Sequence, residues 1–210
     1  MNLLRYLELF VLAGLMLVLG ATAYHRNLVW KDDLSLWSDV VNKSPNKARP
    51  HHNLGLALGC HGSLEQAIGH FFKAVQIKPD HAKAHYNLGV SLAEQGRRKE
   101  AISHYSKALR IKPDHAEAHY NLGIALMRQG SLKGAISHFS KAVQIKPDYA
   151  EAHNNLGVAL MRQGSLNEAF GHFSEALRIK PNLSEARDNL ELGLRLMGKS
   201  HGASNTVIRP

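Results

Sequence analysis

The chain has 210 residues, enough for one or two ordinary domains, and 44% of them are hydrophobic and 20% charged. Its 26 lysines and arginines outnumber 17 acidic residues, which gives a formal charge of +9. The single cysteine, Cys60, excludes an internal disulfide framework and any paired-cysteine zinc or redox site. Only 7 prolines and 17 glycines, with an ordinary apolar share, exclude collagen-like and wholly disordered proteins.

An apolar segment opens the chain. Residues 9–23 carry no charge, and the run 3–23 has about the length that a bilayer span needs. Glu8, directly before the uncharged residues 9–23, is unusual for a signal peptide and favours an uncleaved span. The alternative is a secretory signal peptide, because the run ends in an Ala-x-Ala motif at Ala23. Residues 1–25 are therefore expected to be a transmembrane helix that contacts the membrane through residues 3–23, or a signal peptide. The protein would be single-pass in a membrane, or secreted or periplasmic after cleavage near Ala23.

A period of 34 residues organises the rest of the chain. Five of the seven prolines share it, at positions 45, 79, 113, 147 and 181. Each period contains an Asn-Leu-Gly motif, then a glycine, an alanine, an aromatic residue, a second alanine and the proline. The complete blocks are residues 48–81, 82–115, 116–149 and 150–183.

This pattern resembles the tetratricopeptide repeat (TPR), a helix-turn-helix unit of the same length. In the second block the pattern residues are Leu88, Gly89, Leu92, Gly96, Ala101, Tyr105, Ala108 and Pro113. In such arrays each helix pair buries an apolar stripe against its neighbour. The resemblance implies an all-α TPR solenoid of four full repeats, preceded by an N-terminal transmembrane helix.

Partial repeats are expected at both ends of the array. Residues 26–47 would form a linker and a half repeat, with Trp37 in the aromatic position. Residues 184–198 keep the helical spacing but surround their leucines with charged residues, which predicts a capping helix. Residues 199–210 have no period and are expected to be a flexible tail.

The turns inside the repeats carry recognisable signals. Gly62, Gly96, Gly130 and Gly164 stand where the first helix of each block should end in a left-handed C-cap. The second helix follows at once. Capping boxes are predicted at two of these starts, in which Ser63 pairs with Gln66 and Ser165 with Glu168.

The segment before the first full repeat resembles a junction in polytopic, glycosyltransferase-like membrane proteins, where the last membrane helix meets the repeats. The residues that carry this resemblance are Arg26-Asn27-x-x-Trp30-x-Asp32 and the segment that follows them up to Arg49. This resemblance implies that the repeats are extracytoplasmic. It also implies an alternative function, as an accessory or substrate-presenting part of a protein O-glycosylation system without the catalytic membrane core.

Fourteen histidines invite a metal hypothesis. Eight of them recur at two repeat positions, namely His51, His85, His119 and His153, then His70, His104, His138 and His172. Equivalent side chains of stacked helices lie about 8–10 Å apart, whereas zinc binds nitrogen at about 2 Å. Packing and surface roles are therefore expected, and no metal site.

Catalytic and nucleic-acid-binding signals are absent from the sequence. There is no Gly-x-Ser-x-Gly, His-Glu-x-x-His or phosphate-loop motif, so the chain is expected not to be an enzyme and to have no cofactor, catalytic residue or small-molecule substrate. The lysines before the prolines lie at helix ends, where cations suit the helix dipole. The sequence contains no basic run with interleaved aromatic residues, so nucleic-acid binding is not expected.

One helix face remains for function. The asparagine of each Asn-Leu-Gly motif, with the residues three and seven positions later, falls on a different face from the stacked leucines. In the repeats of O-linked N-acetylglucosamine transferases, which these blocks resemble, asparagines at this position form a ladder along the concave surface and hold an extended peptide by its backbone. An amide both donates and accepts hydrogen bonds, as this task requires. The expected groove residues are Asn53, Asn87, Asn121, Asn155, Asn189, Tyr86, Tyr120, Val90, Ile124, Val158, Arg128 and Arg162.

The alternative is that these asparagines only solvate an exposed face or tie adjacent helices together. The sequence thus predicts a membrane-tethered TPR scaffold that binds a protein or peptide in its groove. A secreted, soluble TPR adaptor is a further alternative.

Overall fold

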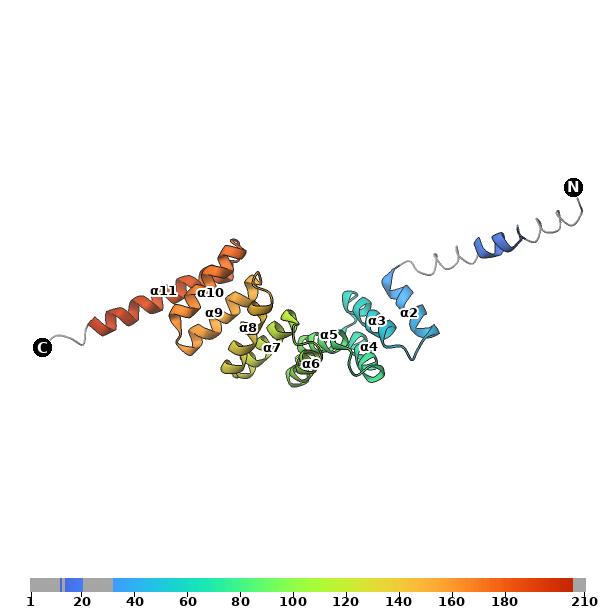
Figure 1. The fold of residues 1–210 in the computed structure, drawn as a ribbon, viewed down its shortest axis with the longest axis horizontal. Helices are drawn as coiled ribbons and strands as arrows, with labels where there is room; N and C mark the ends of the chain where they lie inside the picture. Colours follow the sequence, from blue (N-terminus) through green and yellow to red (C-terminus); the bar gives the residue numbers. More distant parts are fainter. Residues whose placement is uncertain (1–11, 13, 21–31, 206–210) are drawn as a thin grey trace, which may run out of the picture. The chain divides into compact units, whose positions relative to one another are not determined.

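The computed structural model describes residues 12, 14–20 and 32–205, which are coloured in Figure 1. Every named element of this part of the chain is an α-helix. The helices are α2 (Asp33–Lys43), α3 (Ala48–Cys60), α4 (Leu64–Ile77), α5 (Ala82–Glu94), α6 (Arg98–Ile111), α7 (Ala116–Gln129), α8 (Leu132–Ile145), α9 (Ala150–Gln163), α10 (Leu166–Ile179) and α11 (Ser184–Asn205). They fall into two compact units, one up to Pro79 and one from Asp80 onwards.

The apolar segment predicted to span a membrane, residues 1–25, lies largely outside the described residues. Among the helices that the structure does describe, none combines the length and the apolar character of a bilayer span.

The first unit is built on the helix pair α3 and α4, and α2 packs along α3. A capping box that the sequence analysis did not identify begins α2. The Ser35 backbone N–H donates to Asp32 Oδ1 over 2.8 Å, and the Asp32 N–H donates to Ser35 Oγ over 3.3 Å. The sequence signal was the Asp-x-x-Ser spacing that precedes an apolar run.

The second unit stacks three helix pairs, α5–α6, α7–α8 and α9–α10, and α11 packs on the last pair. Each second helix also packs on the first helix of the next pair, as α6 does on α7 and α8 on α9. The core lies between the helices, with Phe139 and Phe173 fully buried. The all-α TPR solenoid predicted from the 34-residue period is confirmed.

Each helix pair is held close by a glycine that faces an aromatic ring. A Cβ atom added to Gly123 would lie 2.7 Å from Cδ1 and Cε1 of Phe139, so only glycine fits this approach of α7 to α8. The same contact recurs between Gly89 and Tyr105, Gly157 and Phe173, and, in the first unit, Gly55 and Phe71. The glycine of the Asn-Leu-Gly motif therefore sets the spacing within each pair.

The glycine C-caps are confirmed, whereas the predicted capping boxes are wrong. Gly130 and Gly164 have φ of +89° and +93°, and the backbone N–H of the serine after each bonds back across the turn. Ser165 N–H donates to the Leu160 carbonyl over 3.0 Å, which closes the preceding helix. This closure leaves Ser165 at φ −82° and ψ 65°, and neither Ser63 nor Ser165 makes a side-chain capping bond. An N-cap that bonds its helix usually has an extended backbone.

The last helix is longer than predicted. The sequence analysis ended the capping helix at Gly198, whereas α11 continues to Asn205. The other helices of the array stop at a glycine turn or before a proline, but the sequence has no proline between Pro181 and Pro210. No proline therefore ends the helix near residue 198.

Candidate functional site

A pocket of about 300 Å³ lies between α5 and α7 in the second unit. Four of the predicted groove residues line it together, namely Val90, Asn121, Ile124 and Arg128. The other lining residues are Ala93, Glu94, Arg98, Tyr105 and Ala125. The face predicted from the asparagine motif is thus hollowed at this point.

The pocket has an apolar floor and a charged edge. Val90 and Ile124 are half-buried, and Tyr105 is 2% exposed because its ring lies against Gly89. Arg98 and Arg128 are exposed. The chain therefore offers aliphatic contact at the base of the pocket and cationic groups at its edge.

Three asparagines of the predicted ladder, which comprises Asn53, Asn87, Asn121, Asn155 and Asn189, connect successive repeats. Asn121 Nδ2 donates to the Tyr86 hydroxyl over 3.0 Å, and Asn155 Nδ2 donates to the Tyr120 hydroxyl over 3.1 Å. Asn189 of α11 makes the corresponding bond to Asn154 Oδ1 over 2.9 Å. The interpretation that these side chains tie adjacent helices together is therefore confirmed for these three positions.

These ties leave amide capacity for a ligand. An asparagine carries two N–H donors and an oxygen that accepts. In the described part of the chain, Asn121 uses one donor, for Tyr86, and its Oδ1 accepts no hydrogen bond. Asn155 has less to offer, because its Oδ1 also accepts a long, 3.4 Å bond from Asn154 Nδ2. Asn121 is therefore the best placed of the two to bind a peptide group.

The rings of the two tyrosines that accept these bonds, Tyr86 and Tyr120, pack on rings from the loops that precede α7 and α9. Tyr86 packs on His115 with ring centroids 4.7 Å apart, and Tyr120 on Tyr149 at 4.9 Å. Burial, with a smaller effect of Glu117, raises the pKa of Tyr86, and burial likewise raises the pKa of Tyr120. Both phenols thus keep their protons over the physiological range, and each accepts a bond from asparagine.

The other predicted groove residues lie elsewhere. Asn87 occupies the ladder position of α5, and Arg162 is exposed on α9. Val158 is half-buried against the core around Phe173. Asn53 belongs to the first unit, where it lines a different pocket of about 570 Å³ with Trp37 and Leu56.

Arg98 is a charged lining residue that sequence reasoning missed. The other three blocks have leucine at this repeat position, namely Leu64, Leu132 and Leu166. The departure from that leucine was the available signal. Arg98 lies at the first position of α6, and its side chain lines the pocket from the second helix of the pair.

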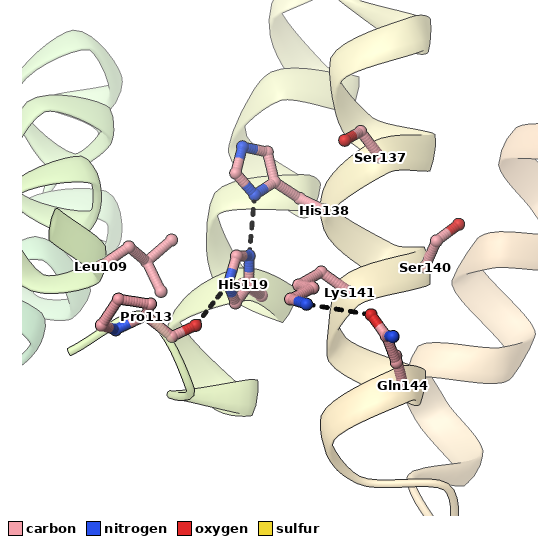
Figure 2. A pocket seen from close by; sticks show the side chains of 8 residues that line it. All are labelled: Leu109, Pro113, His119, Ser137, His138, Ser140, Lys141 and Gln144. Atoms are coloured by element: carbon pink, nitrogen blue, oxygen red, sulfur yellow. Dashed lines mark hydrogen bonds between the residues drawn. The ribbon is translucent and has the colours of Figure 1, made fainter.

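Another pocket of about 570 Å³, in the second unit, contains a histidine pair (Figure 2). His138 Nδ1 lies 2.9 Å from His119 Nδ1, and His119 Nε2 lies 3.0 Å from the Pro113 carbonyl oxygen. The carbonyl only accepts, so His119 donates from Nε2, and when its ring is neutral it accepts at Nδ1. His138 must then donate from Nδ1. Both bonds can therefore be made while the two rings are neutral.

The same pairing recurs in every block. The Nδ1–Nδ1 distances are 3.0 Å for His51 and His70, 3.0 Å for His85 and His104, and 3.1 Å for His153 and His172. Burial, followed by the charge of the partner ring, lowers the pKa of the second histidine in each pair, to about 4 for His104. The constant 19-residue separation was the sequence signal for these pairs. No group of three metal-ligating side chains occurs in the part that the structure describes.

Comparison with known proteins agrees with this architecture. A family model described as TPR repeat matches residues 61–96, 91–130 and 125–164, and a model described as Tetratricopeptide repeat matches residues 150–183. Residues 61–183 are tetratricopeptide repeats. The chain is therefore a TPR solenoid, a scaffold suited to protein–protein interaction.

Several solved structures superpose over most of the chain. YrrB, a TPR protein with an unusual peptide-binding site, is 25% identical with a TM-score of 0.71, over 77% of this chain and 84% of that one. MamA is 26% identical with a TM-score of 0.66, over 72% of this chain and 89% of that one. Pseudomonas aeruginosa pilF is 26% identical with a TM-score of 0.64, over 75% and 72% of the two chains.

A shorter likeness links the chain to a glycosyltransferase. Sixty-three residues are 35% identical to Protein O-mannosyl-transferase F38B6.6 of Caenorhabditis elegans. The match covers 30% of this chain and 9% of that protein. The chain thus shares only a small part of the length of this relative.

Proposed function

We propose that this TPR scaffold binds an extended polypeptide along the face formed by α5, α7 and α9. The observation that carries the proposal is the pocket between α5 and α7, which combines an aliphatic floor with the Asn121 amide. Its volume of about 300 Å³ is at the lower end of the range for ligand pockets. A side chain or two of a longer ligand fit such a space better than a complete small molecule does.

Two interactions would hold the peptide. An aliphatic side chain would lie on Val90 and Ile124, which are half-buried and present apolar surface. The Asn121 amide would bond a backbone peptide group, because it can supply a donor and an acceptor together. Backbone bonds of this kind recognise an extended chain with little dependence on its sequence.

We further propose that the groove binds without catalysing a reaction. No histidine, cysteine or serine lines the pocket between α5 and α7. Two lining residues could still act as a nucleophile or base, but Glu94 is exposed and burial raises the pKa of Tyr105, so that its phenol keeps its proton. The lining therefore supports binding, and a search for turnover of a bound peptide would test this point.

The test must separate peptide binding from the ties between helices, because the ladder asparagines take part in both. We would immobilise the full chain in a mild detergent and screen it against displayed random peptides of twelve residues. The N87A/N121A/N155A variant removes the amides and the ties together. The matched control, Y86F/Y120F, removes the hydroxyls that accept the ties and leaves every amide in place.

We expect the wild-type chain and Y86F/Y120F to retain peptides. We expect N87A/N121A/N155A to lose them while its circular dichroism shows native helicity. Wild-type protein that retains no peptide would refute the proposal. So would a triple variant that binds as well as wild type, since the asparagines would then serve only to join repeats.

The N-terminal segment supports a proposal about location. Residues 3–23 would tether the scaffold to a membrane, because residues 9–23 carry no charge. The junction-like segment from Arg26 to Arg49 supports repeats on the extracytoplasmic side. Intact mass and alkaline extraction of membranes test this. A full-length mass in the extracted membrane pellet is expected. A mature chain that starts after Ala23 and is found in the soluble fraction would replace the tether by a secreted or periplasmic adaptor.

The likeness to an O-mannosyl-transferase favours a second candidate function. In this alternative the groove presents polypeptides to the catalytic core of a protein O-glycosylation system. The 35% identity over 63 residues and the junction-like segment before the repeats support it. Membranes that contain a polytopic mannosyltransferase, assayed for peptide glycosylation with and without this chain, test the idea. An unchanged rate would count against it.

A further inference from the structure

Three arginines stand on the groove side of the second unit without a partner. Arg98 and Arg128 line the pocket between α5 and α7, and Arg162 occupies on α9 the position that Arg128 has on α7. All three are exposed. Their guanidinium groups make no ion pair or hydrogen bond with any residue that the structure describes. The charge at this edge of the groove is therefore not neutralised by the chain itself.

The acidic residues on the same helices are neutralised. Glu151, in the first turn of α9, lies 2.8 Å from Lys180, and Glu117, in the first turn of α7, lies 4.0 Å from Lys146. Arg128 and Arg162 lie in the last turns of these helices, roughly 16 Å away along the axis. The two ends of α7 and α9 thus differ in charge, and the C-terminal ends, which carry the unpaired arginines, attract anions.

One acidic residue shares the pocket with the arginines. Glu94 occupies on α5 the repeat position of Arg128 and Arg162, and it lines the pocket together with Arg98 and Arg128. Its charge offsets one guanidinium, which leaves the pocket edge with a net positive charge. The selectivity expected of this edge is therefore moderate, and it should rise when Glu94 is neutralised.

We infer that the groove selects acidic peptides, in which a carboxylate side chain lies against Arg98 and Arg128 while an aliphatic side chain lies on Val90 and Ile124. Guanidinium groups bind carboxylates through paired, charge-assisted hydrogen bonds. Side chains two positions apart point to the same side of an extended chain. The preferred ligand thus carries Asp or Glu two positions from an aliphatic residue, and a further acidic residue would reach Arg162. This inference rests on the proposed peptide-binding function.

The experiment compares the peptides that different variants select. The full chain in detergent is screened against a random library of displayed twelve-residue peptides, as wild type, as R128Q/R162Q and as R110Q. Arg110 is a matched control, because it is exposed on α6, also makes no ion pair in the described structure and does not line the pocket. Wild type and R110Q are expected to enrich Asp and Glu beside aliphatic residues, and R128Q/R162Q to lose that enrichment.

A pair of synthetic peptides then gives the magnitude. A peptide selected by wild type is compared with its counterpart in which Asn and Gln replace Asp and Glu. An exposed ion pair is worth about 1.4- to 5-fold in affinity, so two arginines predict a preference of about 2- to 25-fold that weakens as salt is added. E94Q is expected to increase the preference.

The outcomes separate this inference from the function on which it rests. If wild type retains peptides without acidic enrichment, or if R128Q/R162Q keeps the wild-type preference, the selectivity is refuted and the groove remains. If no peptide is retained at all, the proposed function and this inference fail together.

Discussion

A methyl group added to Gly123 tests whether the glycine–aromatic contacts set the spacing of the helix pairs. In Gly123→Ala the new Cβ would lie 2.7 Å from two carbons of Phe139 and 3.1 Å from a third. Carbon atoms in contact are about 3.5–4.0 Å apart, so the ring or the helix must move by close to 1 Å. Phe139 is fully buried and has no solvent-exposed space to enter. We therefore expect α7 and α8 to be forced apart.

The magnitude follows from two opposing effects. Overpacking a core costs about 1–3 kcal/mol, whereas replacing glycine by alanine inside a helix gains about 1 kcal/mol. The matched control is Gly171→Ala in α10, where no atom lies within 4 Å of the added Cβ and only the gain applies. The two variants should thus differ by about 1–3 kcal/mol in the free energy of unfolding.

The assay is urea and thermal unfolding of the full-length variants, followed by circular dichroism at a helical wavelength. For a chain of this size, about 2–4 °C of melting temperature corresponds to 1 kcal/mol. Gly171→Ala should melt above wild type, and Gly123→Ala should melt below Gly171→Ala by about 2–12 °C. Equal shifts in the two variants would show that α7 and α8 tolerate the methyl group and that the contact does not set their spacing.

Three further predictions concern the turns, the ladder and the histidine pairs. Gly130→Ala forces a side chain into φ +89° and should lower the unfolding free energy by about 1–2 kcal/mol in a urea titration; an unchanged midpoint would contradict the C-cap assignment. Tyr120→Phe removes the hydroxyl that accepts from Asn155 and should cost about 0.5–1.5 kcal/mol by the same measure, so a variant as stable as wild type would mean that the tie contributes nothing. Burial lowers the pKa of His104 from about 6.5, the ordinary histidine value, to about 4. Between these two pH values the unfolded chain binds more protons than the folded chain, so the free energy of unfolding should fall as the pH drops from about 6.5 toward about 4. Urea midpoints that do not change across this pH window would refute that linkage.

The repeat architecture could be predicted because its signals are local and periodic. The blocks beginning at residues 48, 82, 116 and 150 each start a helix at that residue. A glycine at a fixed offset ends each first helix, because a left-handed residue is needed there and glycine adopts it without strain. The close approach of Gly89 to Tyr105 follows from the same period. Periodicity thus contains the information about which helices pair.

The contacts that sequence reasoning missed depend on the exact placement of one helix against another. Ser165 had the residue type and spacing of a capping box, but the turn that Gly164 closes sets its backbone outside the extended region. The pairing of His119 with His138 needs two side chains on different helices to point at each other. The spacing of 19 residues is visible in the sequence, but the meeting of the rings depends on how the helices are rotated.

The ladder asparagines illustrate why a tie between helices and a ligand site are compatible. The bond from Asn121 to Tyr86 holds the amide in one orientation, so its remaining donor and its Oδ1 keep a fixed direction. Ordering a free side chain costs about 0.5–1.5 kcal/mol on binding. The tie already orders the amide in the unbound protein, so peptide binding does not include this cost. Y86F/Y120F should therefore bind peptides more weakly than wild type, by up to about tenfold for each amide released. N87A/N121A/N155A should lose far more, because the groups that contact the peptide are absent. A Y86F/Y120F variant that binds as tightly as wild type would show that the amides need no preorganisation, and one that loses all binding would shift the ligand role from the asparagines to the tyrosines.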